Sequence, residues 1–463
     1  MPASITKLLI ANRGEIAVRI IRAAQELGLK TVQVYSEADE KSLAIKMADE
    51  AVLIGQAAAQ KSYLNADAIL DAACSTGADA IHPGYGFLAE NADFADSVET
   101  AGIAFIGPSG DIIRRMGDKV AARQAAQEAG VPTVPGSDGV LQDIEKAKVI
   151  ANDIGYPLMI KATAGGGGRG IRIAENEEEF LALAPQASAE AKAAFGDGGL
   201  YLEKFIDDAR HIEVQILGDG KNFVHCFERE CSLQRRRQKV WEEAPSAALT
   251  SEARAALCDS AVALATAVNY CGAGTIEYLY DDNTGDYYFI EMNTRIQVEH
   301  PITECITGID LLAEMITVCS GGKLSVSQDD IQMRGHSIEV RINAEDPANN
   351  FMPFPGVVGD LKVPGGPGVR FDHFLYQGYQ IPPFYDSLLG KLIVHAENRG
   401  KAISRLQRAI SELSGGEMKT TAPLFTALAS DSDVQSGNFH TNWLEPWLKN
   451  NNNKLSRQKG DSF

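Results

Sequence analysis

The chain has 463 residues, of which 45% are apolar and 23% are charged, an ordinary balance for a folded protein with room for two or three domains. Its net charge of -19 excludes a nucleic-acid-binding protein that works through bulk electrostatics, but an anionic substrate could still be held by a local basic cluster. Seven scattered cysteines predict reduced thiols, and the absence of a signal peptide or a membrane-length apolar run predicts a cytoplasmic protein.

Residues 1–115 alternate short apolar runs with helical patterns. Strands are predicted at 8–11, 31–35, 51–54, 78–81 and 103–106, and the helix after the first strand is expected to end at Gly28. This alternation predicts an α/β fold with a Rossmann-like, doubly wound N-terminal domain. The loop Ala11-Asn-Arg-Gly-Glu-Ile-Ala17 has one glycine where a dinucleotide fingerprint needs three, which argues against a dehydrogenase.

The loop His82-Pro-Gly-Tyr-Gly-Phe87 follows a predicted strand. Ligands bind at the carboxyl ends of strands in open α/β sheets, so the loop is either part of a binding site or a tight turn that needs glycine torsions. A linker helix is predicted over 116–135, with Asp118 at its start. Lys119 in its first turn is unfavourably placed for a cation, which hints at a ligand, although a solvated lysine is the plainer interpretation.

Four consecutive glycines separate a strand that ends at Lys161 from a strand that begins at Ile171. Glycine runs let backbone N–H groups approach phosphate oxygens, and Lys161 and Arg169 flank the run with positive charge. A strand follows and no Gly-Lys-Ser/Thr is present, so the run is not a P-loop. It predicts a hairpin that folds over nucleotide phosphates, or else a floppy surface hairpin, within a lid subdomain over 136–203.

Two strands follow a helix predicted over 177–195. The first, at 200–206, offers Glu203, Lys204 and Ile206 as contacts for adenine, unless it is simply an edge strand with exposed charges. On the second, His211, Glu213 and Gln215 alternate and therefore share one face.

The later part of the chain adds a basic cluster and a second sheet. Residues 228–245 carry five basic side chains in twelve positions, which predicts an anion site or a solvated charge run. A sheet is predicted from Ser337 onward, with Arg341 among apolar residues as a functional or ion-paired arginine would be. The polar, asparagine-rich end, 449–463, predicts a disordered tail.

The stretch 288–301 begins as a buried strand and then places polar side chains at alternate positions, on one surface. These side chains are Glu291, Asn293, Arg295, Gln297 and Glu299. A hairpin centred near Thr284 would place Glu277 across from Glu291, and two facing carboxylates need a cation between them. Together with Asn293 they form an all-oxygen set that suits Mg²⁺ or Mn²⁺; the alternative is an exposed hairpin with solvated charges.

Taken together, these motifs resemble the ATP-grasp enzymes and, among them, the biotin carboxylase family. The matching motifs run in family order over residues 4 to about 448: Ala11-Asn-Arg-Gly-Glu-Ile-Ala17, His82-Pro-Gly-Tyr-Gly-Phe87, Met116-Gly-Asp-Lys119, Gly165-Gly-Gly-Gly-Arg-Gly170, Gln234-Arg-Arg…Gln-Lys239, Glu291-Met-Asn-Thr-Arg-Ile-Gln-Val-Glu-His-Pro301 and Arg341-Ile-Asn-Ala-Glu-Asp346. The resemblance implies a mobile glycine-rich lid and, over 204–448, the rest of the ATP-grasp fold with a mixed α/β C-terminal domain. One position departs from the family: Arg237 stands where histidine or asparagine is usual, so its role beside the nucleotide should change.

The resemblance implies a role for each matching site residue. Those matching ATP contacts are Lys119, Lys161, Gly167, Gly168, Glu203, Lys204, Ile206, His211, Gln234, Arg237, Glu277 and Glu291. Those matching magnesium ligands are Glu277, Glu291 and Asn293. Bicarbonate is expected at Lys239, Arg295, Gln297 and Val298, and biotin at Tyr85, Gln297 and Arg341. The implied catalytic residues are Arg295, Glu299, Lys239 and Arg341, with Glu299 as the base that deprotonates bicarbonate and Arg341 as the group that stabilises the enolate-like oxygen of biotin.

The implied reaction is ATP- and bicarbonate-dependent carboxylation of biotin through carboxyphosphate, with two Mg²⁺ or Mn²⁺ ions. No Ala-Met-Lys-Met run occurs, so biotin is expected on a separate biotin carboxyl carrier protein, with a carboxyltransferase as a further partner and a homodimer as the assembly. The final acceptor stays open among acetyl-CoA as the default, pyruvate, another acyl-CoA and a 2-oxo acid. Two other functions stay open as well: an ATP-grasp ligase that joins a carboxylate to an amine, and a catalytically silent scaffold.

Overall fold

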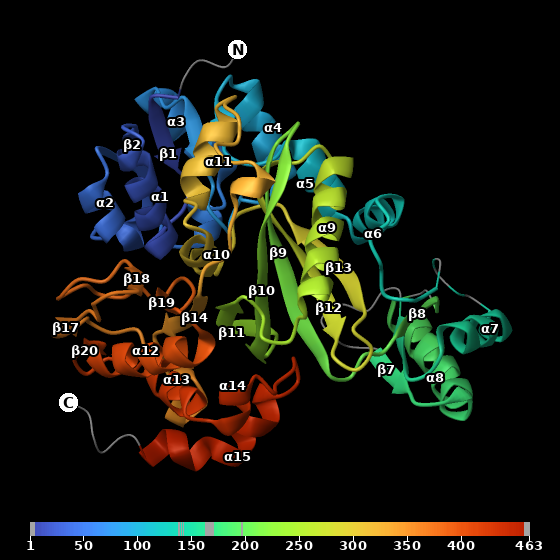
Figure 1. Cartoon of the computed structure of the whole chain (residues 1–463). Helices are drawn as coiled ribbons and strands as arrows, with labels where there is room; N and C mark the ends of the chain where they lie inside the picture. The colour runs from blue at the N-terminus through green and yellow to red at the C-terminus, as the bar shows by residue number, and fades with distance from the viewer. Residues whose placement is uncertain are drawn as a thin grey trace. The chain divides into compact units, whose positions relative to one another are not determined.

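The computed structural model describes residues 5–457 except 138, 140, 142, 163–170, 196 and 197. The chain forms two compact units (Figure 1). The first takes in the described residues of Met1–Val131, Arg210–Leu279 and Glu291–Phe463, and the second takes in those of Pro132–Ala209 and Tyr280–Ile290. The lid subdomain predicted over 136–203 thus falls in the second unit, which also includes the hairpin tip at 280–290.

A five-stranded sheet forms the N-terminal part of the first unit, with all neighbouring strands parallel, as predicted. Its order is β3-β2-β1-β4-β5, with β1 (Lys7–Ile10), β2 (Lys30–Ser36), β3 (Glu50–Gly55), β4 (Ala80–His82) and β5 (Ala104–Phe105). Helix α1 (Gly14–Glu26) packs with Leu8 and Ile10, whereas α3 (Ala66–Thr76) and α4 (Ala92–Thr100) pack with Leu9 on the opposite face. Helices on both faces make this sheet doubly wound.

The loop after β4 is held at the carboxyl edge of this sheet by the loop after β1. The amide of Asn12 donates from Nδ2 to the carbonyl oxygens of Pro83 (2.6 Å) and Tyr85 (2.8 Å). Gly84 has a φ of +64°, and a Cβ there would lie 2.9 Å from Asn12 Nδ2. Glycine at position 84 therefore allows both the positive φ and the close contact with Asn12, and the loop conformation that results positions Tyr85.

An eight-stranded sheet forms the rest of the first unit, in the order β13-β12-β9-β10-β11-β14-β19-β18. The strands are β9 (Ala209–Asp219), β10 (Phe223–Arg235), β11 (Gln238–Ala244), β12 (Cys271–Asp281), β13 (Tyr287–Asn293), β14 (His336–Asn343), β18 (Val369–His373) and β19 (Leu388–Ala396). Its helices are α9 (Ser251–Ala267), α10 (His300–Thr307), α11 (Leu311–Cys319), α12 (Arg399–Glu412), α13 (Ala422–Ala429), α14 (Ser432–Ser436) and α15 (Leu444–Arg457). The core beneath β14 and β19 joins Val340 and Leu392 to Leu406 of α12 and Phe425 of α13.

Shorter elements complete the first unit. Helix α2 (Leu43–Met47) follows β2, and two small sheets pair β15 (Glu345–Asp346) with β16 (Met352–Pro353) and β17 (Leu361–Lys362) with β20 (Ser414–Gly415). The predicted linker region contains two helices, α5 (Gly110–Gly117) and α6 (Lys119–Glu128). Asp118 lies between them and accepts from the backbone N–H groups of Val120 and Ala121, which caps α6 as its sequence position predicts.

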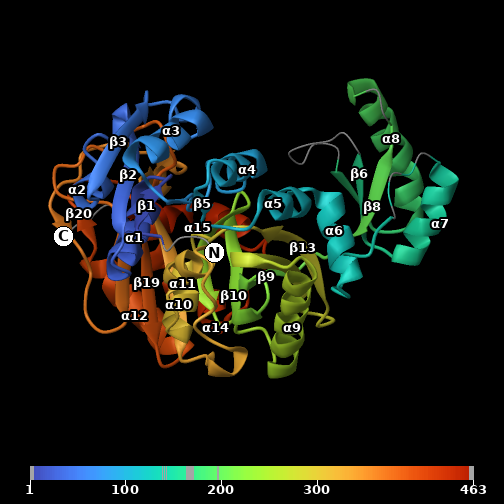
Figure 2. The same cartoon turned by 90° about the horizontal axis from the view of Figure 1, so that it is seen from above.

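The second unit contains an antiparallel sheet in the order β7-β6-β8, with β6 (Leu158–Ala162), β7 (Ile171–Ala174) and β8 (Leu200–Lys204). Helices α7 (Ile144–Ile154) and α8 (Glu177–Phe195) pack beside it (Figure 2), where Ala151 and Phe180 contact Ile160 of the sheet. The antiparallel pairing of β6 with β7 confirms the predicted strand–loop–strand arrangement. The glycine run between them, including Gly167 and Gly168, lies outside the described residues.

The prediction of disorder from residue 449 onward is wrong as far as Arg457, because α15 continues to that residue. The helix is anchored at its start, where Trp447 is buried and donates from its indole to Asp431 (2.7 Å), and Asn451 donates to the Trp447 carbonyl (2.9 Å). Asparagine-rich composition alone did not reveal this anchor. All seven cysteines are free thiols in the structure, and within the described residues no helix is both long and apolar enough to cross a membrane.

Candidate active site

A pocket of about 500 Å³ in the first unit gathers most of the predicted site residues. Its lining includes Tyr85, His211, Gln234, Arg237, Lys239, Glu277, Glu291, Asn293, Arg295, Gln297, Val298, Glu299 and Arg341. Strands β9, β11, β12, β13 and β14 of the eight-stranded sheet each contribute charged or amide side chains, and the segment that follows β13 contributes Arg295, Gln297, Val298 and Glu299. Because side chains alternate along a strand, residues two apart on β9, and likewise on β13, reach the same face.

The ammonium of Lys239 is the centre of the charged floor. It donates to three carboxylates, those of Glu213 (2.5 Å), Glu277 (2.9 Å) and Glu299 (2.8 Å), which uses all three of its protons. Burial opposes the charge on Lys239, but these carboxylates outweigh it and hold its pKa well above the ordinary value. In return, and against their own burial, the ammonium keeps the pKa values of Glu213 and Glu277 below the usual range.

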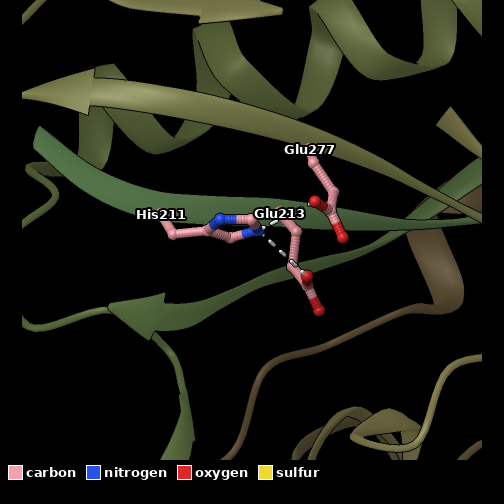
Figure 3. Close-up of side chains that lie close together, drawn as sticks. All are labelled: His211, Glu213 and Glu277. Atoms are coloured by element: carbon pink, nitrogen blue, oxygen red, sulfur yellow. Dashed lines mark ion pairs between the residues drawn. The ribbon is translucent and has the colours of Figure 1, made fainter. Parts of the chain in front are cut away.

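His211 lies beside the same carboxylates, as the alternation on β9 predicts (Figure 3). Its Nε2 is 3.1 Å from Glu277 and 3.7 Å from Glu213. Burial alone would lower the pKa of His211, but the charge of Glu277 raises it to about 9. The imidazole is therefore a cation at neutral pH, suited to an anionic partner and unsuited to binding a metal ion.

The two acids Glu277 and Glu291 lie on neighbouring strands, β12 and β13, joined by the predicted turn, across which Asp281 N donates to the Asp286 carbonyl (2.8 Å). Two cations of the protein, Lys239 and His211, already compensate Glu277, so the expected need for a cation does not by itself require a metal ion. Glu291 is different: burial and the charge of Glu277 both raise its pKa. Asn293 donates to Glu277 (2.9 Å) and accepts at Oδ1 from Arg295 (3.0 Å), so a divalent cation would have to replace Arg295 at that oxygen to join the two carboxylates.

Glu299 is held between two cations. One carboxylate oxygen accepts from Lys239 and the other from Arg341 (3.0 Å), and despite burial its pKa is below the ordinary value. Arg341 also donates to Glu242 (2.7 Å), a fully buried carboxyl whose pKa burial raises to about 7. The sequence analysis did not single out Glu242. Its position in the apolar strand that follows the basic cluster, where an acidic side chain needs a partner, could have identified it.

Arg295 and Gln297 are also fixed by the protein. Arg295 donates from Nε to Glu90 (2.8 Å), a residue of the loop after β4 that the sequence did not single out. Gln297 accepts from Arg229 (2.7 Å) and donates to Glu277 (2.8 Å), so both ends of its amide are engaged. The two side chains are thus held in place by protein groups alone.

The predicted anion-binding role of the basic cluster does not extend to Arg229. Its guanidinium is fully buried and bonds Glu213 (2.6 Å), Gln215 (2.7 Å) and Gln297, among other protein groups. Arg229 is buried, and its donors bond protein groups. Lys239 and Arg237 line the pocket instead. Arg229 therefore holds Glu213 and Gln297 in position.

The remaining predicted residues lie elsewhere. Lys161, Glu203, Lys204 and Ile206 belong to the second unit, where the ammonium of Lys161 forms an ion pair with Glu203 across β6 and β8. Lys119 is exposed at the start of α6, and its charge acts on Glu291. Gly167 and Gly168 lie outside the described residues.

Arg237 occupies a strained turn at the edge of the pocket. The hairpin of β10 and β11 pairs Arg235 with Gln238, which leaves Arg236 and Arg237 as a two-residue loop with φ values of 50° and 63°. Such loops favour asparagine and glycine because both central residues are left-handed. Replacing Arg237 by asparagine or glycine is therefore expected to raise the free energy of unfolding by about 1 kcal/mol, measured by urea denaturation.

A matched control separates torsion from charge at this position. Arg237→Ala removes the same guanidinium but keeps a Cβ at the same φ, so it should bring no such gain. Equal stabilisation by alanine would show that loss of the positive charge, and not relief of the turn, is responsible.

Three family models match the chain in succession. "Biotin carboxylase, N-terminal domain" matches residues 4–113, "Carbamoyl-phosphate synthase L chain, ATP binding domain" matches 118–327, and "Biotin carboxylase C-terminal domain" matches 339–446. The models together span the two sheets of the first unit and the second unit.

Individual proteins resemble the chain over nearly its whole length. Biotin carboxylase 1 of Bacillus subtilis is 54% identical over 444 residues, which cover 96% of this chain and 99% of that protein. A crystal structure of the biotin carboxylase subunit of pyruvate carboxylase is 49% identical with a TM-score of 0.89, covering 96% of this chain and 99% of that one. The biotin carboxylase domain dimer of Hydrogenobacter thermophilus 2-oxoglutarate carboxylase, solved with MgADP, ADP and bicarbonate, is 50% identical with a TM-score of 0.85, covering 96% of this chain and 99% of that one.

Proposed function

The chain belongs to the biotin carboxylase family, and on that premise we propose that it carboxylates biotin carried on a separate protein, with ATP, Mg²⁺ and bicarbonate as co-reactants. It is an ATP-dependent ligase with an ATP-grasp domain. The observation that carries the proposal is the cluster of Lys239, Glu299 and Arg341, which places a carboxylate between two cations at the floor of an open pocket.

Each part of the pocket suits one part of this reaction. Lys239, Arg295, Gln297 and Val298 line the pocket and are the proposed contacts for bicarbonate, which would take over donors that Lys239 and Gln297 now give to protein carboxylates, and Glu299 is the proposed acceptor of its proton. The carbonate formed would attack the γ-phosphate of ATP, release ADP and give carboxyphosphate. That anhydride breaks down to CO₂ and phosphate, phosphate takes the N1′ proton of biotin, and the N1′ anion attacks CO₂ to form carboxybiotin, with Tyr85, Gln297 and Arg341 around the ureido ring.

The nucleotide side of the pocket suits magnesium and phosphates. Glu277, Glu291 and Asn293 would hold the metal. Burial and the charge of Glu277 both oppose ionisation of Glu291, and a bound cation would offset them. Bound magnesium would neutralise negative charge on the phosphates of ATP. His211, Gln234 and Arg237 add donors to the pocket, and Lys119 of α6, whose charge acts on Glu291, is proposed as a further ATP contact. Lys161, Gly167, Gly168, Glu203, Lys204 and Ile206 are proposed as the remaining ATP contacts, because they lie in the part of the chain that the ATP-binding-domain model matches.

The proposal is tested by phosphate release from ATP. Full release should require bicarbonate, free biotin or a biotinylated carrier, and Mg²⁺ together, and a chelator should reduce it to background. Release driven instead by an amine with a carboxylic acid would favour the ligase alternative. Absence of release under every combination, with Mg·ATP still bound, would favour a silent scaffold.

The carrier and the acceptor are proposed from the relatives. Biotin carboxylase 1 of Bacillus subtilis matches over 99% of its own length, which supports a subunit that works on a separate biotin carrier together with a carboxyltransferase. A homodimer is proposed in the same way from the dimer of the Hydrogenobacter thermophilus domain. The carboxyltransferase that co-purifies with the chain identifies the acceptor, with acetyl-CoA as the default and pyruvate, another acyl-CoA or a 2-oxo acid as the other outcomes.

A further inference from the structure

Two buried side chains hold the backbone of the segment that follows β13, on either side of Val298. His300 donates from Nδ1 to the Gln297 carbonyl (2.7 Å), since a carbonyl oxygen only accepts. Lys391 of β19 donates from Nζ to the Val298 carbonyl (2.8 Å). Both side chains are completely buried, and burial and nearby cations keep the pKa of His300 well below its ordinary value, so it is neutral.

The orientation of the Val298 N–H follows from these two bonds, together with a longer one (3.3 Å) from the backbone N–H of His300 to the Gln297 carbonyl. The Gln297 carbonyl and the Val298 N–H belong to the same trans peptide and point in opposite directions. His300 holds that carbonyl toward the protein interior, so the N–H faces the other way, and Val298 lines the pocket. Lys391 fixes the next peptide, so neither peptide plane of Val298 can turn freely.

Lys391 also pairs with Glu15, which bonds the pocket residue Tyr85. Its ammonium is 3.2 Å from a carboxylate oxygen of Glu15 in α1, and the same oxygen accepts the hydroxyl of Tyr85. The other Glu15 oxygen is buried without a hydrogen-bond partner among the described residues, and burial raises the Glu15 pKa. Asp372 pairs with Lys391 across β18 and β19 but is itself bonded to Arg370. One ammonium thus bonds the Val298 peptide and a carboxylate that holds Tyr85.

We propose that Lys391 is a positioning residue which, with His300, aims the Val298 N–H at bicarbonate and ties that peptide to Tyr85 on the biotin side. The inference rests on the proposed function, because it takes Val298 and Tyr85 as contacts for the two substrates. Burying a lysine costs free energy because its charge is desolvated. Holding the Val298 peptide at the bicarbonate position and Glu15 beside Tyr85 at the biotin position would give Lys391 a role beyond packing.

The test compares Lys391→Met with the double variant Lys391→Met/Glu15→Gln. The single variant leaves Glu15 buried without its counter-charge and can fail to fold, whereas the double variant removes both charges. In the double variant the KM for bicarbonate should rise about tenfold or more, the scale of one charge-assisted hydrogen bond, while the KM for ATP stays within about twofold. Lys401→Met, at a lysine whose side chain is 60% exposed, is the matched control and should change neither.

His300 supplies a second, independent variant pair. Asparagine keeps an N–H donor near the position of Nδ1, and leucine removes it, so His300→Leu should raise the KM for bicarbonate and His300→Asn should restore most of the loss. Equal KM values for these two variants, or a folded Lys391 double variant with an unchanged KM for bicarbonate, would overturn the inference. Failure of the proposed function shows separately, as a wild-type enzyme whose phosphate release does not depend on bicarbonate and biotin.

Discussion

Replacing Glu299 by glutamine is expected to slow bicarbonate-dependent phosphate release by about 10²- to 10⁴-fold, the usual contribution of a general base. Glutamine keeps the size of the side chain but cannot take a proton at neutral pH. Binding of Mg·ATP should survive, because Glu299 bonds Lys239 and Arg341 and does not belong to the proposed metal ligands.

The low pKa of Glu299 has a consequence for how it can act as a base. Lys239 and Arg341 both stabilise its ionised form, which makes it a weak acceptor of protons as it stands. Bicarbonate bound beside Lys239 would compete for that ammonium. If the Lys239 ammonium then donated to bicarbonate instead of Glu299, the pKa of Glu299 would rise, and Glu299 would become a better base when the substrate is bound.

The measurement is initial-rate phosphate release at saturating ATP and biotin, with ATP affinity followed by calorimetry on the same preparation. Near-ultraviolet circular dichroism checks that the variant is folded, since the new amide places a donor against a cation. A folded variant that keeps more than about one tenth of the wild-type rate would assign the proton transfer to another group, because a true base supplies at least about 10²-fold.

Much of the fold was predictable because its signals are local. Alternating apolar runs and helical patterns predicted the parallel sheet around β1, and the turn residues near Thr284 predicted the hairpin of β12 and β13. Alternation along the strand predicted a common face for Glu291 and Asn293, and the hairpin predicted that Glu277 lies on the neighbouring strand. The helical extension of α15 was missed because its anchor, Trp447 on Asp431, is a tertiary contact.

The supporting shell of the site was not predictable for the same physical reason. Arg341 bonds Glu242, 99 positions away in sequence, and Lys391 bonds the Val298 carbonyl, 93 positions away. Buried charges must be paired, but the sequence does not say with which partner. Arg229 shows the reverse error: a basic residue counted toward an anion site spends its donors on Glu213 and Gln297.

Replacing Lys239 by methionine is expected to have the largest effect on stability. Glu213, Glu277 and Glu299 would remain buried around an uncharged side chain, and breaking a buried ion pair from one side costs about 3–5 kcal/mol. The variant should also lose bicarbonate-dependent phosphate release. Unfolding free energies are measured by urea denaturation with a chelator present, because a divalent cation could replace the ammonium.

The cost of Lys239→Met should depend on pH. In the wild type the pKa values of Glu213 and Glu277 are lowered, so these groups stabilise the fold above the ordinary carboxyl pKa of about 4.3 and lose that effect as the pH falls through their folded values. Without the ammonium, burial shifts both pKa values upward against the remaining cations Arg229 and His211, so the stabilisation above pH about 4.3 shrinks. The stability gap between wild type and variant should therefore be larger at about pH 8 than at about pH 5. The same gap at both pH values would mean that the loss is one of packing and not of charge, and adding Glu277→Gln to the variant should then recover nothing.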